Sequence, residues 1–265
     1  MKIYISADIE GVTGTTAWDE ANKTHPDYGQ FQTQMTQEVK AACEGAMEAG
    51  ADEIVVKDAH ASGRNITAAE LPECVKLVRG WSRHPYMMMQ ELNGTFDAAL
   101  MIGYHARAGS TQNPLAHTMN SSKFAWIQIN GMEVSEFLLN AYTASLEQVP
   151  LVFISGDQGV CAEAQERIPL IQTVPVKTGA GDSTINIHPK LACDTIRRGV
   201  RESLGSINPA CCAELPAHFA VTIQFNDFKE AYRAAFFPGA SDMGTGRISF
   251  SAAGYLDVLK LMLFI

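Results

Sequence analysis

Short apolar runs that alternate with helical patterns constrain the fold of this chain more than any other feature of its sequence. The apolar runs lie at residues 1–7, 53–60, 96–106, 149–157 and 171–177. Helical spacing of apolar residues occupies 32–49, 159–167 and 189–204. Near-continuous apolar strands separated by helices are typical of a parallel sheet that helices cover on both faces. We therefore expect an α/β fold, a three-layer domain built on a parallel or mixed sheet.

The last third of the chain has a different pattern, in which apolar and polar residues alternate. Strands of this kind are predicted there at 218–225 and 246–252, with helices at 227–236 and 252–263, and residues 123–134 earlier in the chain have the same character. Alternation is typical of a sheet with one buried face. We therefore expect a second, smaller α+β domain. The predicted division is 1–115 plus 141–205 for the larger domain and 116–140 plus 206–265 for the smaller one.

Charge and composition exclude several classes of partner. The 265 residues carry a net charge of −9, with no run of Lys or Arg, so neither a nucleic acid nor an anionic membrane is an expected partner. The longest apolar stretch, at 255–265, is too short to span a bilayer and includes Asp257 and Lys260. The six cysteines lack CxxC spacing and no signal peptide is evident at the first residues. These features favour a cytoplasmic protein with reduced thiols.

Metal-binding side chains follow three of the predicted strands. Asp8 and Glu10 come after the first strand, His60 after the second and His105 after the third. Alone, each is more often a turn or loop residue, but parallel strands bring their carboxyl ends to one edge of the sheet. If the first strand extends to residue 10, the two carboxylates converge and repel each other. Asp, Glu and His are ligands of hydrolytic zinc sites. The pattern therefore predicts one or two divalent metal ions at this edge.

Other candidates are less distinct from ordinary structural residues. His117 lies in a polar loop and is either a surface residue or a general base or oxyanion-stabilising group. Glu136 begins an apolar helical pattern, where an acid also stabilises the helix dipole, and Glu133 is an equal competitor on composition. Asp58 and Asp157 end strands and could orient ligand histidines.

Two further stretches have no predicted chemistry. The glycine-rich "TGAGDST" at 178–184 fits neither the dinucleotide fingerprint nor the P-loop, and we expect a mobile loop there. The "MMM" run at 87–89 is expected to belong to the core rather than to a metal site.

Several dispersed motifs occur together in an order that resembles a known enzyme family. They are "ADIEG", "KDAHASGRN", "GYHARAGS", "LAHTM", "FLLNAY", "VFISGDQ" and "VPVK". Together they resemble the M55 family of metallopeptidases, over almost the whole chain up to about residue 205. The resemblance implies a binuclear zinc aminopeptidase with two domains and two zinc ions per chain. It also implies a homodecamer of stacked rings that encloses a chamber.

The resemblance also implies roles for individual residues. Asp8 is the carboxylate that bridges both metals. Glu10 and His105 complete the ligands of one zinc, and His60 and Glu136 those of the other. The match to "VSEFLLNAY" selects Glu136 rather than its neighbour at 133. His117, the histidine of "AHTM", takes the place of the catalytic residue of the family.

The expected substrate is a short peptide with a free N-terminus. The family implies peptides of D-amino acids of the D-Ala-D-Ala type, and an aminopeptidase acting on L- or other short peptides is the alternative. A haloacid-dehalogenase-like phosphatase also has two acids two residues apart after its first strand, as in "DIEGVTGT", but it has no use for His60 and His105. A non-catalytic peptide-binding protein with structural metals is a third reading, although structural zinc sites usually close with four protein ligands, often Cys.

Overall fold

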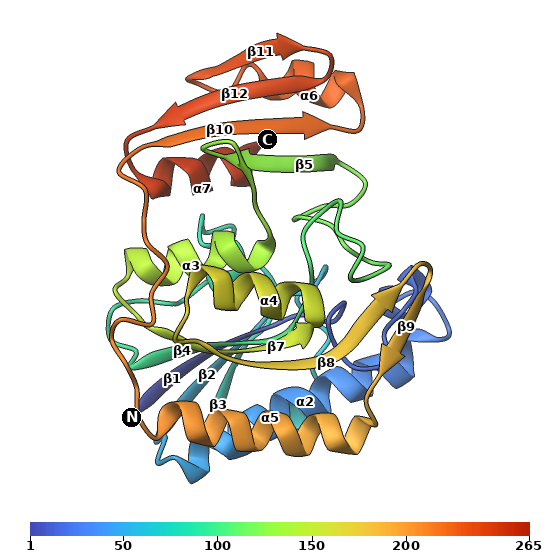
Figure 1. Ribbon diagram of the computed structural model, residues 1–265, viewed down its shortest axis with the longest axis vertical. Helices are drawn as coiled ribbons and strands as arrows, with labels where there is room; N and C mark the ends of the chain where they lie inside the picture. The colour runs from blue at the N-terminus through green and yellow to red at the C-terminus, as the bar shows by residue number, and fades with distance from the viewer.

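The larger of two sheets forms the centre of the molecule in the computed structural model, which describes all 265 residues (Figure 1). Its strand order is β3-β2-β1-β4-β7-β8-β9. The strands are β1 (Lys2–Ala7), β2 (Glu53–Asp58), β3 (Val75–Val78), β4 (Ala98–Tyr104), β7 (Leu151–Asp157), β8 (Gln172–Ala180) and β9 (Ser183–Asn186). All neighbours are parallel except β9, which is antiparallel to β8. The predicted α/β fold with a mixed sheet is confirmed.

Helices cover both faces of this sheet and complete the predicted three layers. One face carries α2 (Tyr28–Glu48) and α5 (Pro189–Leu204), and the other carries α3 (Glu136–Leu146) and α4 (Gln158–Arg167) (Figure 1). The shorter helical segments are α1 (Trp18–Ala21), η1 (Ala68–Glu70) and η2 (Met87–Met89). Met88 and Met89 are buried in the core, as the sequence predicts. No helix is both long and apolar enough to cross a membrane.

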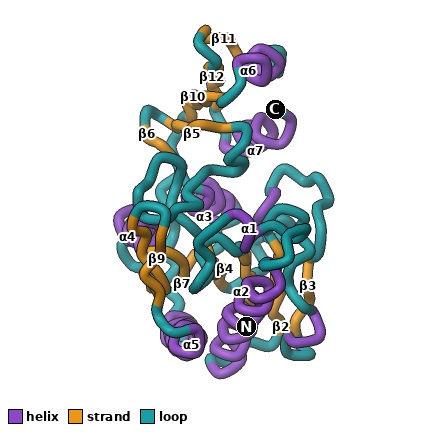
Figure 2. The backbone as a smooth tube through the Cα atoms, turned by 90° about the vertical axis from the view of Figure 1, so that its right-hand side faces the viewer, coloured by secondary structure: helices purple, strands orange, loops and turns teal.

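A second, antiparallel sheet stands above α3 and α4 in Figure 1 and is well separated from α2 and α5 in Figure 2. Its order is β11-β12-β10-β5-β6. The strands are β5 (Phe124–Ile129), β6 (Met132–Glu133), β10 (Phe219–Phe225), β11 (Ala240–Gly244) and β12 (Arg247–Ala252). Alternate residues of β10 are buried, with α6 (Phe228–Ala234) and α7 (Tyr255–Phe264) packed on the sheet. The predicted α+β character of this region is confirmed.

The predicted domain bounds stay a prediction. Strands β5 and β6 lie within 116–140, and β10 to β12 lie within 206–265. Helix α3 begins at Glu136, inside the range predicted for the smaller domain, and packs on β4 and β7 of the larger sheet. The segment 117–136 therefore connects the two sheets.

One local expectation was wrong. Residues 178–184 are not a loop, because β8 and β9 continue into a hairpin that turns at Gly181, with φ at 61°. Gly181 serves the turn rather than mobility. Strand β1 ends at Ala7, so the extension to residue 10 that would align Asp8 and Glu10 is not present. The six cysteines are free, and Cys74 is the exposed one.

The strand order creates a crevice beside the end of β1. The chain leaves β1 toward β2 on one side and reaches β4 on the other, and ligands of α/β proteins bind at such a switch point. The loop after β1 lies unusually close to the end of β4, where the Gly11 N–H donates to the Gly103 carbonyl at 2.8 Å. A Cβ at Gly11 would lie 1.7 Å from the Tyr104 carbonyl oxygen, so only glycine fits there.

Candidate metal centre

All six predicted site residues meet at this crevice and are buried. The loop after β1 contributes two carboxylates, the ends of β2 and β4 contribute one histidine each, and the remaining two residues come from the loop after β4 and the first turn of α3. Their exposed fractions are Asp8 2%, Glu10 2%, His60 8%, His105 0%, His117 8% and Glu136 3%. Although β1 stops at Ala7, its two following acids still converge, because the Asp8 N–H donates to the Ile102 carbonyl at 2.9 Å and holds the loop against β4.

Asp8 lies between two histidines and turns one oxygen toward each. Its Oδ1 is 3.3 Å from His60 Nδ1, and its Oδ2 is 3.6 Å from His105 Nε2. Glu10 Oε2 lies 3.0 Å from the same nitrogen of His60, and Glu136 Oε2 lies 3.5 Å from His105 Nε2. The cluster therefore has two halves, with Asp8 common to both.

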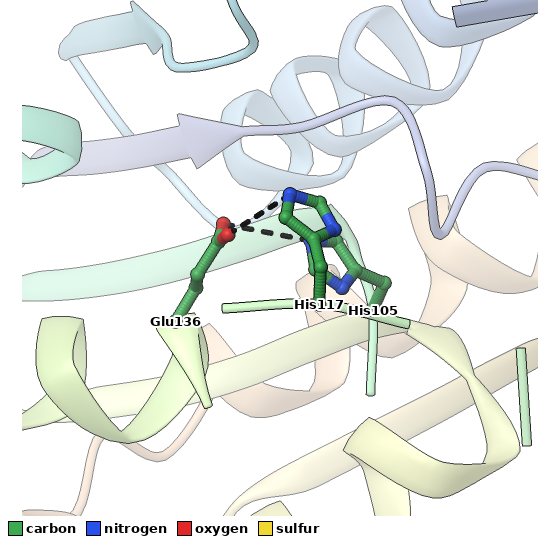
Figure 3. A group of neighbouring side chains, drawn as sticks. All are labelled: His105, His117 and Glu136. Atoms are coloured by element: carbon green, nitrogen blue, oxygen red, sulfur yellow. Dashed lines mark ion pairs between the residues drawn. The ribbon is translucent and has the colours of Figure 1, made fainter. Parts of the chain in front are cut away.

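His117 stands beside the second half of the cluster. Its Nε2 is 3.4 Å from Glu136 Oε1, so this carboxylate faces two histidines at once (Figure 3). The rings of His105 and His117 stack with their centroids 4.3 Å apart and their planes within 10°. The edge of Trp18 packs on the His117 ring at 5.2 Å between centroids. Aromatic packing thus fixes the plane of the His117 imidazole.

Each of the three histidines points one ring nitrogen at a backbone carbonyl. The contacts are His60 Nε2 to Ala21 O at 2.8 Å, His105 Nδ1 to Ala106 O at 2.9 Å and His117 Nδ1 to Leu115 O at 2.9 Å. A carbonyl only accepts, so the nitrogen that faces it must carry a proton. With the ring neutral, as a metal ligand requires, the other nitrogen would direct its lone pair toward the space between the carboxylates.

The donor set fits a divalent metal ion. Glu10 Oε2 and His105 Nε2 are buried without a hydrogen bond, since the nearest side chains approach them outside hydrogen-bonding geometry. Unsatisfied buried polar atoms are costly, and a cation would satisfy these two. Carboxylate oxygens and imidazole nitrogens are the ligands of catalytic zinc, whereas cysteines dominate many closed structural sites. Two separate groups of potential ligands lie here, Asp8 with Glu10 and His60, and His105 with His117 and Glu136.

The electrostatics of the cluster also favour added positive charge. Burial and the nearby Glu10 carboxylate raise the pKa of Asp8 to about 8. Burial lowers the pKa of His105, but Glu136 and Asp8 outweigh it and raise that pKa to about 10. Burial opposes ionisation of Glu10 as well, yet the His60 imidazolium holds the pKa of Glu10 well below its ordinary value. Protons and imidazolium groups thus balance three buried carboxylates, a task that metal cations perform at such sites.

Polar residues outside the cluster hold the backbone of its loops. Asp58 accepts hydrogen bonds from the Asn65 and Ile66 N–H groups and supports the loop after His60. Asp157 accepts from the Ala106 N–H at 2.8 Å, next to His105. Both acids therefore orient backbone rather than the histidine rings. Glu133 forms an ion pair with Arg107 and lies outside the cluster, so Glu136 is the acid that joins it.

Sequence reasoning missed several residues around the centre. Lys177 is buried at the end of the "VPVK" run and donates to the carbonyls of Glu10 and Thr15, and burial lowers the pKa of this lysine to about 8. Asn113 donates to the same Glu10 carbonyl at 2.9 Å. For Lys177, the only sequence signal was a lysine at the end of an apolar run. A loop asparagine such as Asn113 has no such signal.

An open cavity of about 290 Å³ gives access to the centre. It reaches the cluster residues Asp8, Glu10, His60, His117 and Glu136, and its walls include Trp18, Trp81, Met88 and Met119. A small molecule can therefore reach the cluster from solvent.

The whole chain matches one family. The family model of the M55 peptidases, described as D-aminopeptidase, covers residues 1–264. The chain belongs to the M55 peptidase family. It is therefore a hydrolase that cleaves peptides, and the match over its full length does not favour a phosphatase or a non-catalytic binding protein.

Known relatives of this M55 peptidase share both its sequence and its fold. A D-aminopeptidase of Bacillus subtilis (strain 168) is 29% identical over 265 residues, which are 99% of this chain and 96% of the relative. A solved structure, described as the Zn-dependent D-aminopeptidase DppA from Bacillus subtilis, a self-compartmentalizing protease, superposes with a TM-score of 0.91 at 28% identity. That alignment covers 99% of this chain and 96% of the solved chain.

Proposed function

We propose that this M55 peptidase is a zinc-dependent D-aminopeptidase that removes the N-terminal residue of short peptides. The observation that carries the proposal is the buried carboxylate of Asp8, whose two oxygens face different halves of one cluster. The zinc dependence and D-aminopeptidase activity of similar proteins support it. The proposed ligands of two zinc ions are Asp8, Glu10, His60, His105 and Glu136.

The division of the ligands between the ions stays a prediction. The family resemblance pairs Glu10 with His105 and His60 with Glu136. In the structure, Glu10 lies nearest His60, and Glu136 lies beside both His105 and His117. In either division, Asp8 is the shared ligand.

The residues of this chain have distinct proposed tasks. When bound, paired metal ions polarise a carbonyl and make hydroxide available near neutral pH. His117 and Glu136 both line the cavity, and His117 Nε2 lies 3.4 Å from Glu136 Oε1. The other ring nitrogen, Nδ1, donates to the Leu115 carbonyl. This imidazole can therefore stabilise a developing oxyanion or pass a proton to the leaving amine. The buried acids of the cluster favour the free α-amine of a peptide substrate over a blocked one.

We infer the remaining properties from the same relatives. The description of the solved relative as self-compartmentalizing supports a homo-oligomer, for which a decamer is the specific expectation. A D-Ala-D-Ala type peptide is the proposed substrate, and short L-peptides are the alternative. Action in the cytoplasm stays a prediction.

Metal content and stereospecific hydrolysis test this function together. The purified protein is analysed for bound metals per chain, and the same sample is assayed on D-Ala-D-Ala and on L-Ala-L-Ala. We expect about two zinc ions per chain, release of free D-alanine and loss of activity with a chelator. Preference for L-Ala-L-Ala would favour the alternative substrate class. Absence of hydrolysis after loading with zinc or manganese would overturn the proposal.

A further inference from the structure

The cavity beside the metal centre continues into a second, more apolar one. This second cavity has a volume of about 380 Å³ and is lined by ten residues, seven of them apolar. Ala61, Trp81, Met88 and Met119 line both cavities. We call this second cavity the methionine cavity, after Met87, Met88 and Met119 in its wall. It leads from the metal centre toward α7, which contributes Met262 to its wall.

The walls of the methionine cavity have an unusual backbone. Four residues that line the second cavity have positive φ without being glycine: Ala61 at 44°, Arg83 at 68°, Met87 at 45° and Met119 at 66°. The whole chain has only eight such residues. Strained backbone of this kind persists where the surrounding structure enforces it, and it concentrates at ligand sites. The surrounding structure therefore enforces the shape of this cavity.

Trp81 gives the cavity a fixed wall. Its Nε1 donates to the Ala61 carbonyl at 2.8 Å, and the Lys57 ammonium lies 4.0 Å from the ring centroid. The three methionines opposite are flexible and polarisable, so they adapt to apolar groups of different shape. The cavity thus suits an apolar side chain without demanding a single one.

A free cation lines the outer part of the cavity. Arg83 is exposed and forms no ion pair or side-chain hydrogen bond in the structure. A guanidinium binds a carboxylate through two parallel hydrogen bonds. In a dipeptide, the only free carboxylate belongs to the residue that leaves after cleavage.

We propose that the methionine cavity binds the leaving residue of the substrate, with Arg83 binding its free carboxylate. This enzyme then favours dipeptides whose second residue is large and apolar over those ending in alanine. The inference rests on the proposed aminopeptidase function, because the metal centre must hold the scissile bond for the leaving residue to enter this cavity. The four lining residues that the two cavities share support that order.

A peptide series tests the apolar part of the inference. We expect kcat/KM for D-Ala-D-Leu to exceed that for D-Ala-D-Ala by roughly tenfold, since an added hydrocarbon group in a fitted pocket gains at least this much. Met87→Ala should reduce the ratio several-fold, and Met87→Leu should restore it. Equal kcat/KM values for the two peptides in the wild-type enzyme would overturn the inference while leaving the aminopeptidase function intact.

The carboxylate contact is tested with blocked peptides. We expect D-Ala-D-Leu amide to be cleaved roughly 10- to 100-fold less efficiently than D-Ala-D-Leu, as for the loss of a charged hydrogen bond. Arg83→Gln should abolish this difference, and Arg83→Lys should retain part of it. Arg198→Gln, an exposed arginine on α5, is the matched control and should keep the full difference. A full difference in Arg83→Gln would overturn the assigned role of Arg83.

Binding of the product alone gives a readout that does not depend on turnover. Calorimetric titration should show tighter binding of free D-leucine than of D-alanine, and Met87→Ala should remove the difference. If no peptide is cleaved but this preference persists, the proposed function fails and the leaving-residue role fails with it, whereas the preference of the cavity for apolar residues holds. If D-leucine binds no better than D-alanine, the inference is overturned.

Discussion

Glu136 and Glu133 differ by three positions and lie in opposite surroundings. Glu136 is buried between His105 and His117, whereas Glu133 pairs with Arg107 at the surface. We expect Glu136→Gln to lose one metal ion and on the order of 100-fold in kcat/KM, because it removes a charged ligand. Glu133→Gln is the control and should stay within about twofold, as exposed ion pairs contribute little. Elemental analysis and peptide assays check both, and a similar loss in the two variants would contradict the assignment.

His117 is the residue for which catalysis and metal binding must be separated. If it acts on protons or on the oxyanion, His117→Gln should keep both metals and lower kcat by roughly 100- to 10,000-fold. Metal content and kcat measured on one sample decide the matter. Loss of a metal ion together with activity would make His117 a ligand instead, since it lies within reach of a cation shared with His105 and Glu136.

Glu38 on α2 provides a pH dependence remote from the metal centre. Its side chain is fully buried and accepts from the Thr13 N–H at 3.0 Å, and burial raises its pKa from 4.5 to about 7. Between these values the folded protein keeps a proton that the unfolded chain has released, so this group makes stability fall as pH rises. Glu38→Gln should remove that fall. Its free energy of unfolding relative to wild type should rise by roughly 3 kcal/mol between pH 4.5 and 7.

Urea unfolding at several pH values measures this difference. Above about pH 7 the difference should stay constant, because Glu38 is then ionised in both states. A difference that does not change between pH 4.5 and 7 would contradict the prediction.

At the scale of elements, the apolar runs were sufficient to predict the central strands β1, β2, β4, β7 and β8. His60 and His105 were identifiable because each follows a buried strand, and strand ends gather at one edge. Strands β3, β9 and β11 escaped prediction because none is fully buried, so they lack a continuous apolar run. The choice of Glu136 over Glu133 needs the hairpin and the start of α3, which composition does not encode.

The loop after β1 depends on a glycine for its approach to β4. A Cβ at Gly11 would collide with the Tyr104 carbonyl, and the backbone on both sides is held by hydrogen bonds. We expect Gly11→Ala to lower the free energy of unfolding by about 2 kcal/mol or more, and to weaken metal binding by displacing Glu10. Gly29→Ala on α2, where a Cβ meets no atom within 4 Å, should leave stability equal or higher. Equal stability of the two variants would contradict the prediction.

At the scale of the whole molecule, the proposed homodecamer leads to a prediction about mass. The solved relative is described as self-compartmentalizing, and the proposed decamer of this chain would have a mass about ten times the 28.8 kDa of a single chain. Light scattering after size exclusion measures this mass directly. A monomer that retains full activity would show that enclosure is not required for catalysis.

The segment between the two sheets has a mechanical consequence. His117 precedes β5, Glu136 follows β6, and both side chains meet at the same cluster. The Met119 N–H also donates to Glu136 Oε1 at 2.6 Å, so a hydrogen bond joins the two ends of the segment 117–136. A rotation of the second sheet would pull on both ends at once. In the proposed oligomer, a force that a neighbouring subunit exerts on that sheet would therefore displace His117 and Glu136 together.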